Sequence, residues 1–221
     1  MATLPSVPWL NYEQIRIKAD SFLEKHHPSK TIPIPIEEIV EFKLELDIVP
    51  LPGLRNIDVD GFMYSDLSAI AIDQTIVEHV NPSRYRFTLA HEIGHLVLHS
   101  QLYRDSNIRN IRSYLEFVRN LPQPFLDKAE WEAYCFAGLV LVPRGPLKSR
   151  AKRIAKDVAE IISELPNKAK AEENTNLLRD IVEKEIAKVF KVSQPVISKR
   201  VGYDKLDLDK IITEAIHNLG L

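Results

Sequence analysis

The sequence has little cysteine, little glycine and no long apolar run. Cys135 is the single cysteine among 221 residues, which excludes an intrachain disulfide and a Cys-x-x-Cys metal site. The seven glycines form no glycine-rich phosphate loop, which argues against the common nucleotide-binding classes. No stretch approaches the roughly 18 apolar residues that cross a membrane, and residues 1–9 lack a signal-peptide pattern. We therefore expect a soluble, cytoplasmic protein with no membrane contact.

Neither sign of charge is in excess. The chain has 29 Lys and Arg against 31 Asp and Glu, a formal net charge of −2. This balance argues against a globally basic nucleic-acid binder and against an acidic disordered tail. Hydrophobic residues make up 45% of the chain, which is typical of a globular protein of one or two domains.

Apolar spacing and proline positions predict the main elements. Residues 11–27 form a helix in which Ile15, Ala19, Phe22 and Leu23 share one face. Expected strands cover 44–50, 61–64 and 69–72, the last two joined as a hairpin through 65–68, and expected helices cover 83–99 and 129–142. Residues 104–127 are expected to be a loop with one helical turn at 114–118.

The run His91-Glu92-Ile93-Gly94-His95 is an HExxH motif within the expected helix 83–99. Residues 91 and 95 lie about 40° apart around an α-helix, so both imidazoles face the same side, as two zinc ligands must. Glu92 lies about 100° round the helix, where it can act as general base beside the metal. By itself the motif also fits an amphipathic helix with two polar histidines.

A catalytic zinc needs a third protein ligand, and the next expected helix offers Glu130. Small residues continue its face at 133 and 137, and the HExxH helix has a matching small face at 90 and 94. Two small faces allow close packing, which would bring Glu130 to the two histidines. Glu132 lies about 200° away from Glu130 around the helix, so we expect it to be solvated or to support a ligand.

Other histidines are weaker candidates. His99 lies eight residues after His91 with no glycine turn before it, and we expect it to cap carbonyls at the helix end. We expect the remaining four histidines to lie at the surface: His26, His27, His79 and His217.

Several motifs occur together in the order found in one peptidase family. They are Arg86-Phe-Thr-Leu-Ala-His-Glu-Ile-Gly-His-Leu-Val-Leu-His99, Glu130-Trp-Glu-Ala-Tyr-Cys-Phe-Ala137 and Leu139-Val-Leu-Val-Pro143. They closely resemble the core signature of the ImmA/IrrE family of zinc metallo-endopeptidases. The resemblance covers roughly residues 12 to 145. The chain departs from the family pattern at Tyr134, where the family usually has Asn or Asp, so a group that orients a ligand is altered.

The resemblance implies an α+β fold with a zincin-like (gluzincin) core over residues 1–145, a small antiparallel sheet and the HExxH motif on a helix. It implies Zn²⁺ as the cofactor, held by His91, His95 and Glu130. Glu92 would be the catalytic base that assists attack of a zinc-bound water on a peptide bond. Members of the family cleave helix-turn-helix transcriptional repressors, often on mobile elements or in stress responses.

Residues 146–221 are expected to form a mainly helical extension, packed on the core or independent of it. The segment 183–201 resembles the second half of a helix-turn-helix, with the turn at 192–193. A family segment of similar sequence packs on the catalytic core, and we weight that interpretation about twice as heavily as DNA binding.

Residues 144–156 carry six basic side chains and no acidic one. Such a run is more often a solvated helix face than a nucleic-acid patch, so a nucleic-acid partner has weak support.

Two functions therefore fit the sequence. The first is a zinc endopeptidase that cleaves a specific intracellular protein, a helix-turn-helix repressor, with an oxyanion donor among His99 and Tyr64, Tyr85, Tyr103 and Tyr114. In this function the hairpin over 61–73 would bind substrate by strand addition, and residues 104–127 would act as a lid. The second is a regulatory DNA- or repressor-binding protein that keeps the fold without protease activity.

Overall fold

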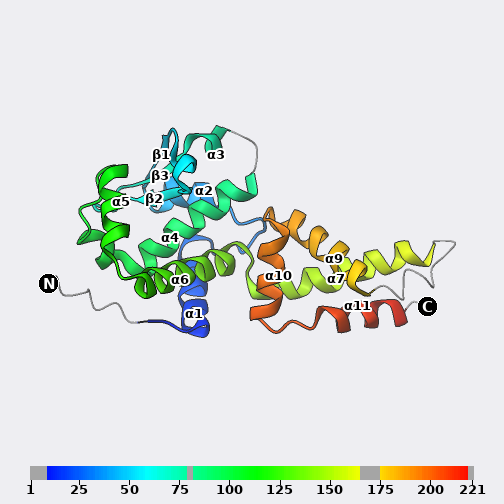
Figure 1. Cartoon of the computed structure of the whole chain (residues 1–221). Helices are drawn as coiled ribbons and strands as arrows, with labels where there is room; N and C mark the ends of the chain where they lie inside the picture. Colours follow the sequence, from blue (N-terminus) through cyan, green and yellow to red (C-terminus); the bar gives the residue numbers. More distant parts are fainter. Residues whose placement is uncertain (1–8, 79–81, 165–174, 219–221) are drawn as a thin grey trace. The chain divides into compact units, whose positions relative to one another are not determined.

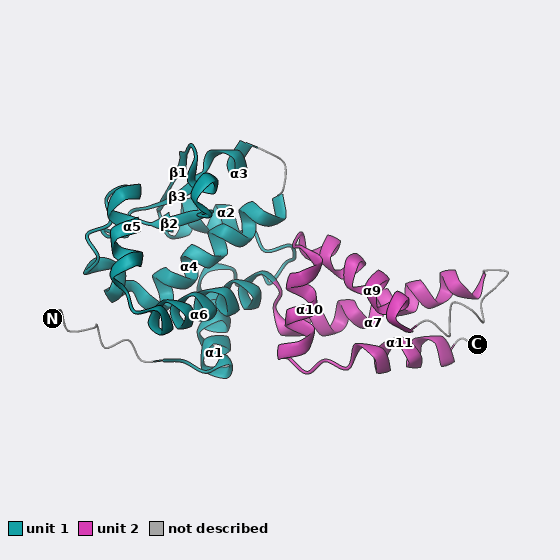
Figure 2. Ribbon diagram, viewed as in Figure 1, with its two compact units in different colours: residues 1–141 teal, residues 142–221 magenta. Residues whose placement is uncertain are grey.

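The computed structural model describes residues 9–78, 82–164 and 175–218. The chain divides into two compact units, residues 1–141 and 142–221 (Figure 2). Both are mainly helical, and the first also holds a small sheet. None of the helices within the described ranges combines the length and apolar character needed to cross a bilayer.

Unit 1 begins with a helix that the sequence predicts well. Asn11 caps it, because its side chain accepts a hydrogen bond from the backbone N–H of Gln14. Ile15 and the other residues of the predicted apolar face are buried. In chain order (Figure 1) the elements of unit 1 are α1 (Tyr12–His26), α2 (Ile36–Glu38), the π-helical turn η1 (Ile39–Lys43), β1 (Asp47–Leu51), the 3-10 turn η2 (Leu54–Ile57), β2 (Gly61–Met63), β3 (Ala69–Asp73), α3 (Gln74–Glu78), α4 (Pro82–Arg104), α5 (Ile111–Asn120) and α6 (Gln123–Leu141).

The sheet has the strand order β1-β3-β2 and is mixed. β2 and β3 pair antiparallel, with Gly61 opposite Ile72, which confirms the predicted hairpin. β1 instead runs parallel to β3, with Asp47 opposite Ala69, so the prediction of a small antiparallel sheet is wrong for this pair. The chain turns back between residues 52 and 60 before it enters β2, so β1 joins the far side of β3. All five residues of β3 are buried, as expected for a central strand.

Helices α4 and α6 pack closely through their small residues. A Cβ atom on Gly94 would lie 2.9 Å from the Cα of Ala133 and 3.0 Å from its carbonyl oxygen. Ala90, Ala133 and Ala137 are fully buried. The predicted contact between two small faces is therefore confirmed, and glycine at position 94 is required because any side chain would push α6 away.

Most of the segment 104–127 is helical, where a loop with a single helical turn at 114–118 was expected. α4 continues to Arg104 through a non-helical residue, His99, with φ −128° and ψ 19°. Asn110 then caps α5 in a capping box with Ser113. Pro122 precedes α6 and Pro124 lies in its first turn, where proline removes no helical hydrogen bond. These two prolines therefore mark the start of a helix and not the end of a loop.

Unit 2 consists of four described helices, α7 (Arg144–Ser163), α9 (Thr175–Phe190), α10 (Gln194–Tyr203) and α11 (Leu208–His217). Its core is apolar, with Val182, Ile186, Phe190 and Ile197 fully buried. The turn between α9 and α10 has a left-handed residue at Lys191, which reverses the chain. Most of the basic side chains on the first half of α7 are exposed, as expected for a solvated helix face.

Candidate metal centre

Three side chains from two helices of unit 1 converge on one point. His91 and His95 project from α4 and Glu130 projects from α6, and their possible ligand atoms all lie within 4.8 Å of one another. His91 Nε2 is 3.1 Å from Glu130 Oε2 and 3.1 Å from His95 Nε2. His95 Nε2 is 3.4 Å from Glu130 Oε1. The structure therefore brings together the three residues that the sequence predicts as metal ligands.

The helices account for this convergence. His91 and His95 are four residues apart, so successive turns of α4 present both rings on one side. The close contact of Gly94 with Ala133 sets the distance between α4 and α6. Glu130 lies on α6 one turn before Ala133, and its carboxylate reaches both imidazoles.

The donor set fits a divalent ion. Two imidazole nitrogens and one carboxylate oxygen, with a fourth position open, are typical ligands of a catalytic zinc. Ligands about 2.1 Å from a tetrahedral ion lie about 3.4 Å from one another. The three observed separations are 3.1, 3.1 and 3.4 Å, so the site could hold a metal with little rearrangement.

Glu92 is buried beside this cluster, with an exposed fraction of 4%. Burial raises the pKa of its carboxyl from 4.5 to about 7, and the nearby charge of Glu130 also raises it, whereas His91 lowers it. Glu92 Oε2 has no hydrogen-bond partner among the described residues. A carboxylate with a free oxygen and a pKa near neutrality is suited to accept and return a proton.

The three cluster residues shift one another's pKa values. Burial alone would lower the pKa of His91, but the hydrogen bond and charge of Glu130 outweigh it and raise that pKa. Burial lowers the pKa of His95 and outweighs the effect of Glu130. Burial would raise the pKa of Glu130, but hydrogen bonds to the two rings hold it well below its usual value. Glu130 is therefore ionised, as a metal ligand must be.

Glu92 predicts a pH dependence of stability in the metal-free protein. Its carboxyl ionises near pH 4.5 in the unfolded chain but only near pH 7 in the native state, so its contribution to stability is lost as the pH rises through that window. The shift corresponds to about 3 kcal/mol. We expect the free energy of unfolding of Glu92→Gln, relative to that of wild type, to rise by about 2–3 kcal/mol as the pH increases from about 5 to about 8. Urea denaturation with a chelator present measures this difference.

Glu130→Gln is the matched control, because its effect has the opposite sign. The low pKa of Glu130 means that its ionised form stabilises the native state above the unfolded pKa, and this contribution is lost as the pH falls. Glu130→Gln should therefore be less stable than wild type at pH 8. Equal pH profiles for wild type and Glu92→Gln would contradict the burial argument.

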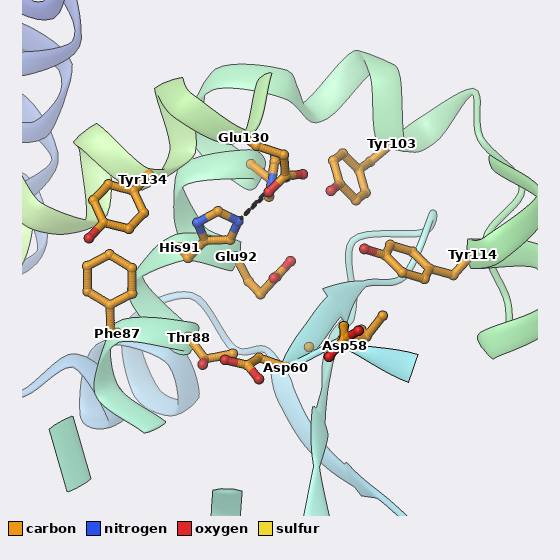
Figure 3. A pocket seen from close by; sticks show the side chains of 13 residues that line it. Asp58, Asp60, Phe87, Thr88, His91, Glu92, Tyr103, Tyr114, Glu130 and Tyr134 are labelled. Carbon is orange, nitrogen blue, oxygen red and sulfur yellow. Dashed lines mark hydrogen bonds and ion pairs between the residues drawn. The ribbon is translucent and has the colours of Figure 1, made fainter. Parts of the chain in front are cut away.

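The cluster and Glu92 line a cavity of about 390 Å³ (Figure 3). Tyr103 and Tyr114 also line it, and both hydroxyl groups point toward the carboxyl groups of Glu92 and Glu130. Burial raises the pKa of both phenols, so they remain protonated donors at neutral pH. Of the other tyrosines considered as oxyanion donors, Tyr64 and Tyr85 are not among the lining residues, and the Tyr85 hydroxyl donates to Glu37.

An aromatic pair forms another part of the cavity wall. The rings of Phe87 and Tyr134 lie 4.8 Å apart, and both residues line the cavity. Tyr134 occupies the position at which an Asn or Asp was expected to orient a ligand. Its ring contributes apolar surface to the cavity instead.

The family comparison agrees with this geometry. The model of the peptidase M78 family, described as the IrrE N-terminal-like domain, matches residues 54–201, about two thirds of the chain. The chain belongs to the IrrE-like peptidase family. This confirms the resemblance to the ImmA/IrrE family, and the match includes all three cluster residues and Glu92. No match was found among curated proteins.

Membership of the IrrE-like family indicates a metallopeptidase. The His91, His95 and Glu130 cluster is the place where the described residues could hold its metal.

Behind the cluster, the expected capping role of His99 is wrong, and of the two alternatives for Glu132 the solvated one is wrong. Glu132 is fully buried and not solvated, and its Oε2 lies 3.1 Å from His99 Nε2. His99 does not cap carbonyls among the described contacts; its Nδ1 lies 3.1 Å from His95 Nδ1. Burial and the nearby His95 lower the pKa of His99 to about 4, so its imidazole is neutral. The available signal was spacing: His99 follows His95 by one turn.

The other described histidines, His26, His27 and His217, are not part of the cluster. His27 is buried, contrary to prediction, with Nε2 2.9 Å from the carbonyl oxygen of Thr31. His26 packs its ring against Phe22, and His217 is exposed. His79 lies outside the described residues.

Proposed function

We propose that the protein is a zinc-dependent endopeptidase that acts in the cytoplasm on one specific protein, a helix-turn-helix transcriptional repressor. One observation carries the peptidase activity: Glu92 is buried beside the three possible ligands, with a free carboxylate oxygen on the shared cavity. Membership of the IrrE-like family supports hydrolysis of peptide bonds. The repressor as substrate follows from the resemblance to the ImmA/IrrE signature.

His91, His95 and Glu130 would hold the ion. When bound, zinc polarises a substrate carbonyl and lowers the pKa of a neighbouring water. Glu92 would accept a proton from the attacking water at Oε2 and later deliver it to the leaving amine. The raised pKa of Glu92 suits both transfers, because general acid–base catalysis is most efficient when the pKa lies near the working pH.

The tyrosine hydroxyls would stabilise the developing oxyanion. Tyr103 and Tyr114 approach the cavity from α4 and α5, and their O–H groups face the position between Glu92 and Glu130 (Figure 3). Tyr114 also gives the lid hypothesis a concrete form, because α5 lies within the segment expected to control access. A movement of α5 would withdraw the Tyr114 hydroxyl from the cavity and open the cavity at the same time.

Strand β2 offers a binding edge for substrate. It lies at the end of the sheet order and pairs with β3 on one side. Gly61, its first residue, lines the cavity. A substrate in extended conformation could add to this strand through backbone hydrogen bonds and place its scissile bond at the cluster.

Metal analysis and a cleavage assay together test the proposal. We expect about one zinc per chain, and cleavage of a purified helix-turn-helix repressor that stops with a chelator and returns with added zinc. A protein that takes up no zinc would contradict the metallopeptidase. Zinc-loaded protein that binds such repressors without cutting them would favour the regulatory alternative.

Unit 2 supplies the observation that favours this alternative. α9 and α10 follow one another across a short turn, as the two helices of a helix-turn-helix would, and α7 exposes several basic side chains. However, Val196, Ile197 and Val201 of α10 are buried within the described chain, which leaves part of that helix unavailable to DNA. We therefore rank DNA or repressor binding without cleavage second.

A further inference from the structure

We propose that His99 and Glu132 are positioning residues that hold His95 in the tautomer required for metal binding. The proposal rests on the proposed metal site. It assigns a role to a buried chain of hydrogen bonds that runs away from the cavity, from His95 through His99 to Glu132.

The chain of contacts is continuous and dry. His95 Nδ1 is 3.1 Å from His99 Nδ1, and His99 Nε2 is 3.1 Å from Glu132 Oε2. The exposed fractions of His95, His99 and Glu132 are 2%, 1% and 0%. Water therefore cannot replace any of these partners, and each group must satisfy the next.

Glu132 also has fixed partners at its other oxygen. The backbone N–H of Leu10 donates to Oε1 at 2.7 Å, and Lys128 Nζ lies 3.5 Å from the same atom. Lys128 in turn donates to the Leu10 carbonyl at 2.9 Å. The carboxylate is thus held as an acceptor from both sides.

This anchoring sets the direction of every hydrogen bond in the chain. A carboxylate can only accept, so His99 must donate through Nε2–H. A neutral His99 then presents a lone pair at Nδ1, and His95 must donate its Nδ1–H to it. The second nitrogen of His95, Nε2, is left with a lone pair that faces His91 and Glu130, as a metal ligand requires.

The same arrangement shows why Glu130 and Glu132 have different roles although they are two residues apart. Their side chains lie about 200° apart around α6. Glu130 reaches the cavity, whereas Glu132 points into the protein interior beside His99 and Leu10. A merely structural role would be to satisfy buried polar groups; the positioning role adds a specific effect on His95.

His99→Leu and His99→Gln separate the two roles. Leucine removes the acceptor for His95, whereas the glutamine amide can accept from His95 and donate to Glu132. We expect His99→Leu to weaken zinc binding by about 10- to 100-fold, and His99→Gln to stay within about threefold of wild type, since the amide restores both hydrogen bonds. Zinc affinity is measured by competition with a chelator, and stability by urea denaturation of the metal-free chain.

A direct readout is the protonation of His95 itself. Nitrogen NMR of the metal-free protein should show His95 protonated at Nδ1 in wild type and His99→Gln, with a shift toward Nε2 in His99→Leu. Val140→Ala is the control, because Val140 is fully buried on α6 and its truncation should lower stability without removing any hydrogen bond between His95, His99 and Glu132. It should leave both the zinc affinity and the His95 tautomer unchanged.

Unchanged zinc affinity and an unchanged His95 tautomer in His99→Leu would overturn the proposal, as would equal losses in His99→Leu and His99→Gln. If His99→Leu does not fold, Glu132→Gln is the alternative. It keeps the size of the side chain but removes the carboxylate that sets the direction of the hydrogen bonds, so both His95 tautomers should be populated. A single Nδ1–H tautomer there would also overturn it. A wild-type chain that binds no zinc would contradict the proposed function, while the NMR result would still decide the positioning role.

Discussion

Glu92→Gln is expected to lower the rate of peptide cleavage by about 10²- to 10⁴-fold while zinc stays bound. Glutamine keeps the size and position of the side chain but cannot accept a proton at Oε2. The three possible ligands do not include Glu92, so metal affinity should change little. The rate is measured on a purified helix-turn-helix repressor, and zinc content is determined on the same sample.

The same substitution, Glu92→Gln, distinguishes the proposed peptidase from the alternative, a regulatory protein that acts by binding. Glu41→Gln, on the exposed side of η1, is a matched control that should cut at the wild-type rate. Binding of the repressor should survive in Glu92→Gln. If regulation in cells also survives, the protein acts by binding and the peptidase proposal fails.

The candidate site was predictable from the sequence because helices make it. Helical periodicity places His91 and His95 on one face, and the small residues at 90, 94, 133 and 137 identify a close helix pair that carries Glu130. These are local patterns, and the packing at Gly94 confirms the close approach.

The predictions of secondary structure and sheet topology failed where the outcome depends on contacts between residues distant in the sequence or on helix caps within polar segments. β1 pairs directly with β3 although β2 lies between them in the sequence, and nothing in residues 47–51 indicates whether the pairing is parallel or antiparallel. Only one turn of α5, at 114–118, was predicted, because Asn110 and Ser113 form its cap within a polar segment and its apolar face is only half-buried.

Glu132 shows the limit of reasoning from helix angles. The angle of about 200° from Glu130 excludes it from the cavity but does not say whether the far side is solvent or core. Leu10 and His99 decide this, and Leu10 is 122 residues away in the sequence. A buried carboxylate held by such distant partners can be found only from the packed structure.

Removal of the hydroxyl groups of Tyr103 and Tyr114 is also expected to lower the rate of peptide cleavage strongly. Tyr103 packs its ring 5.1 Å from that of His95, and Tyr114 stacks on Phe62 at 4.8 Å. These contacts hold the rings in place without using the hydroxyl groups. Phenylalanine at both positions should therefore keep the packing and remove only the two hydroxyl donors that face the cavity.

We expect Tyr103→Phe with Tyr114→Phe to lower kcat by about 10²- to 10³-fold, with the zinc content and KM near wild type. The reason is that a donor to the oxyanion acts in the transition state and contributes little to the bound substrate. Steady-state kinetics on the repressor substrate measures both constants. The single variants then show which hydroxyl carries the effect, because loss of the main donor alone should account for most of it.

Tyr64→Phe is the matched control for this pair. Tyr64 also packs against Phe62, at 5.4 Å, but it is not among the residues that line the cavity. It should retain the wild-type kcat. An unchanged kcat in the double variant would show that neither phenol reaches the oxyanion, and the stabilising charge would then have to come from the metal alone. A raised KM with kcat unchanged would instead mean that the two tyrosines bind substrate, and that α5 forms a wall of the cavity without taking part in the reaction.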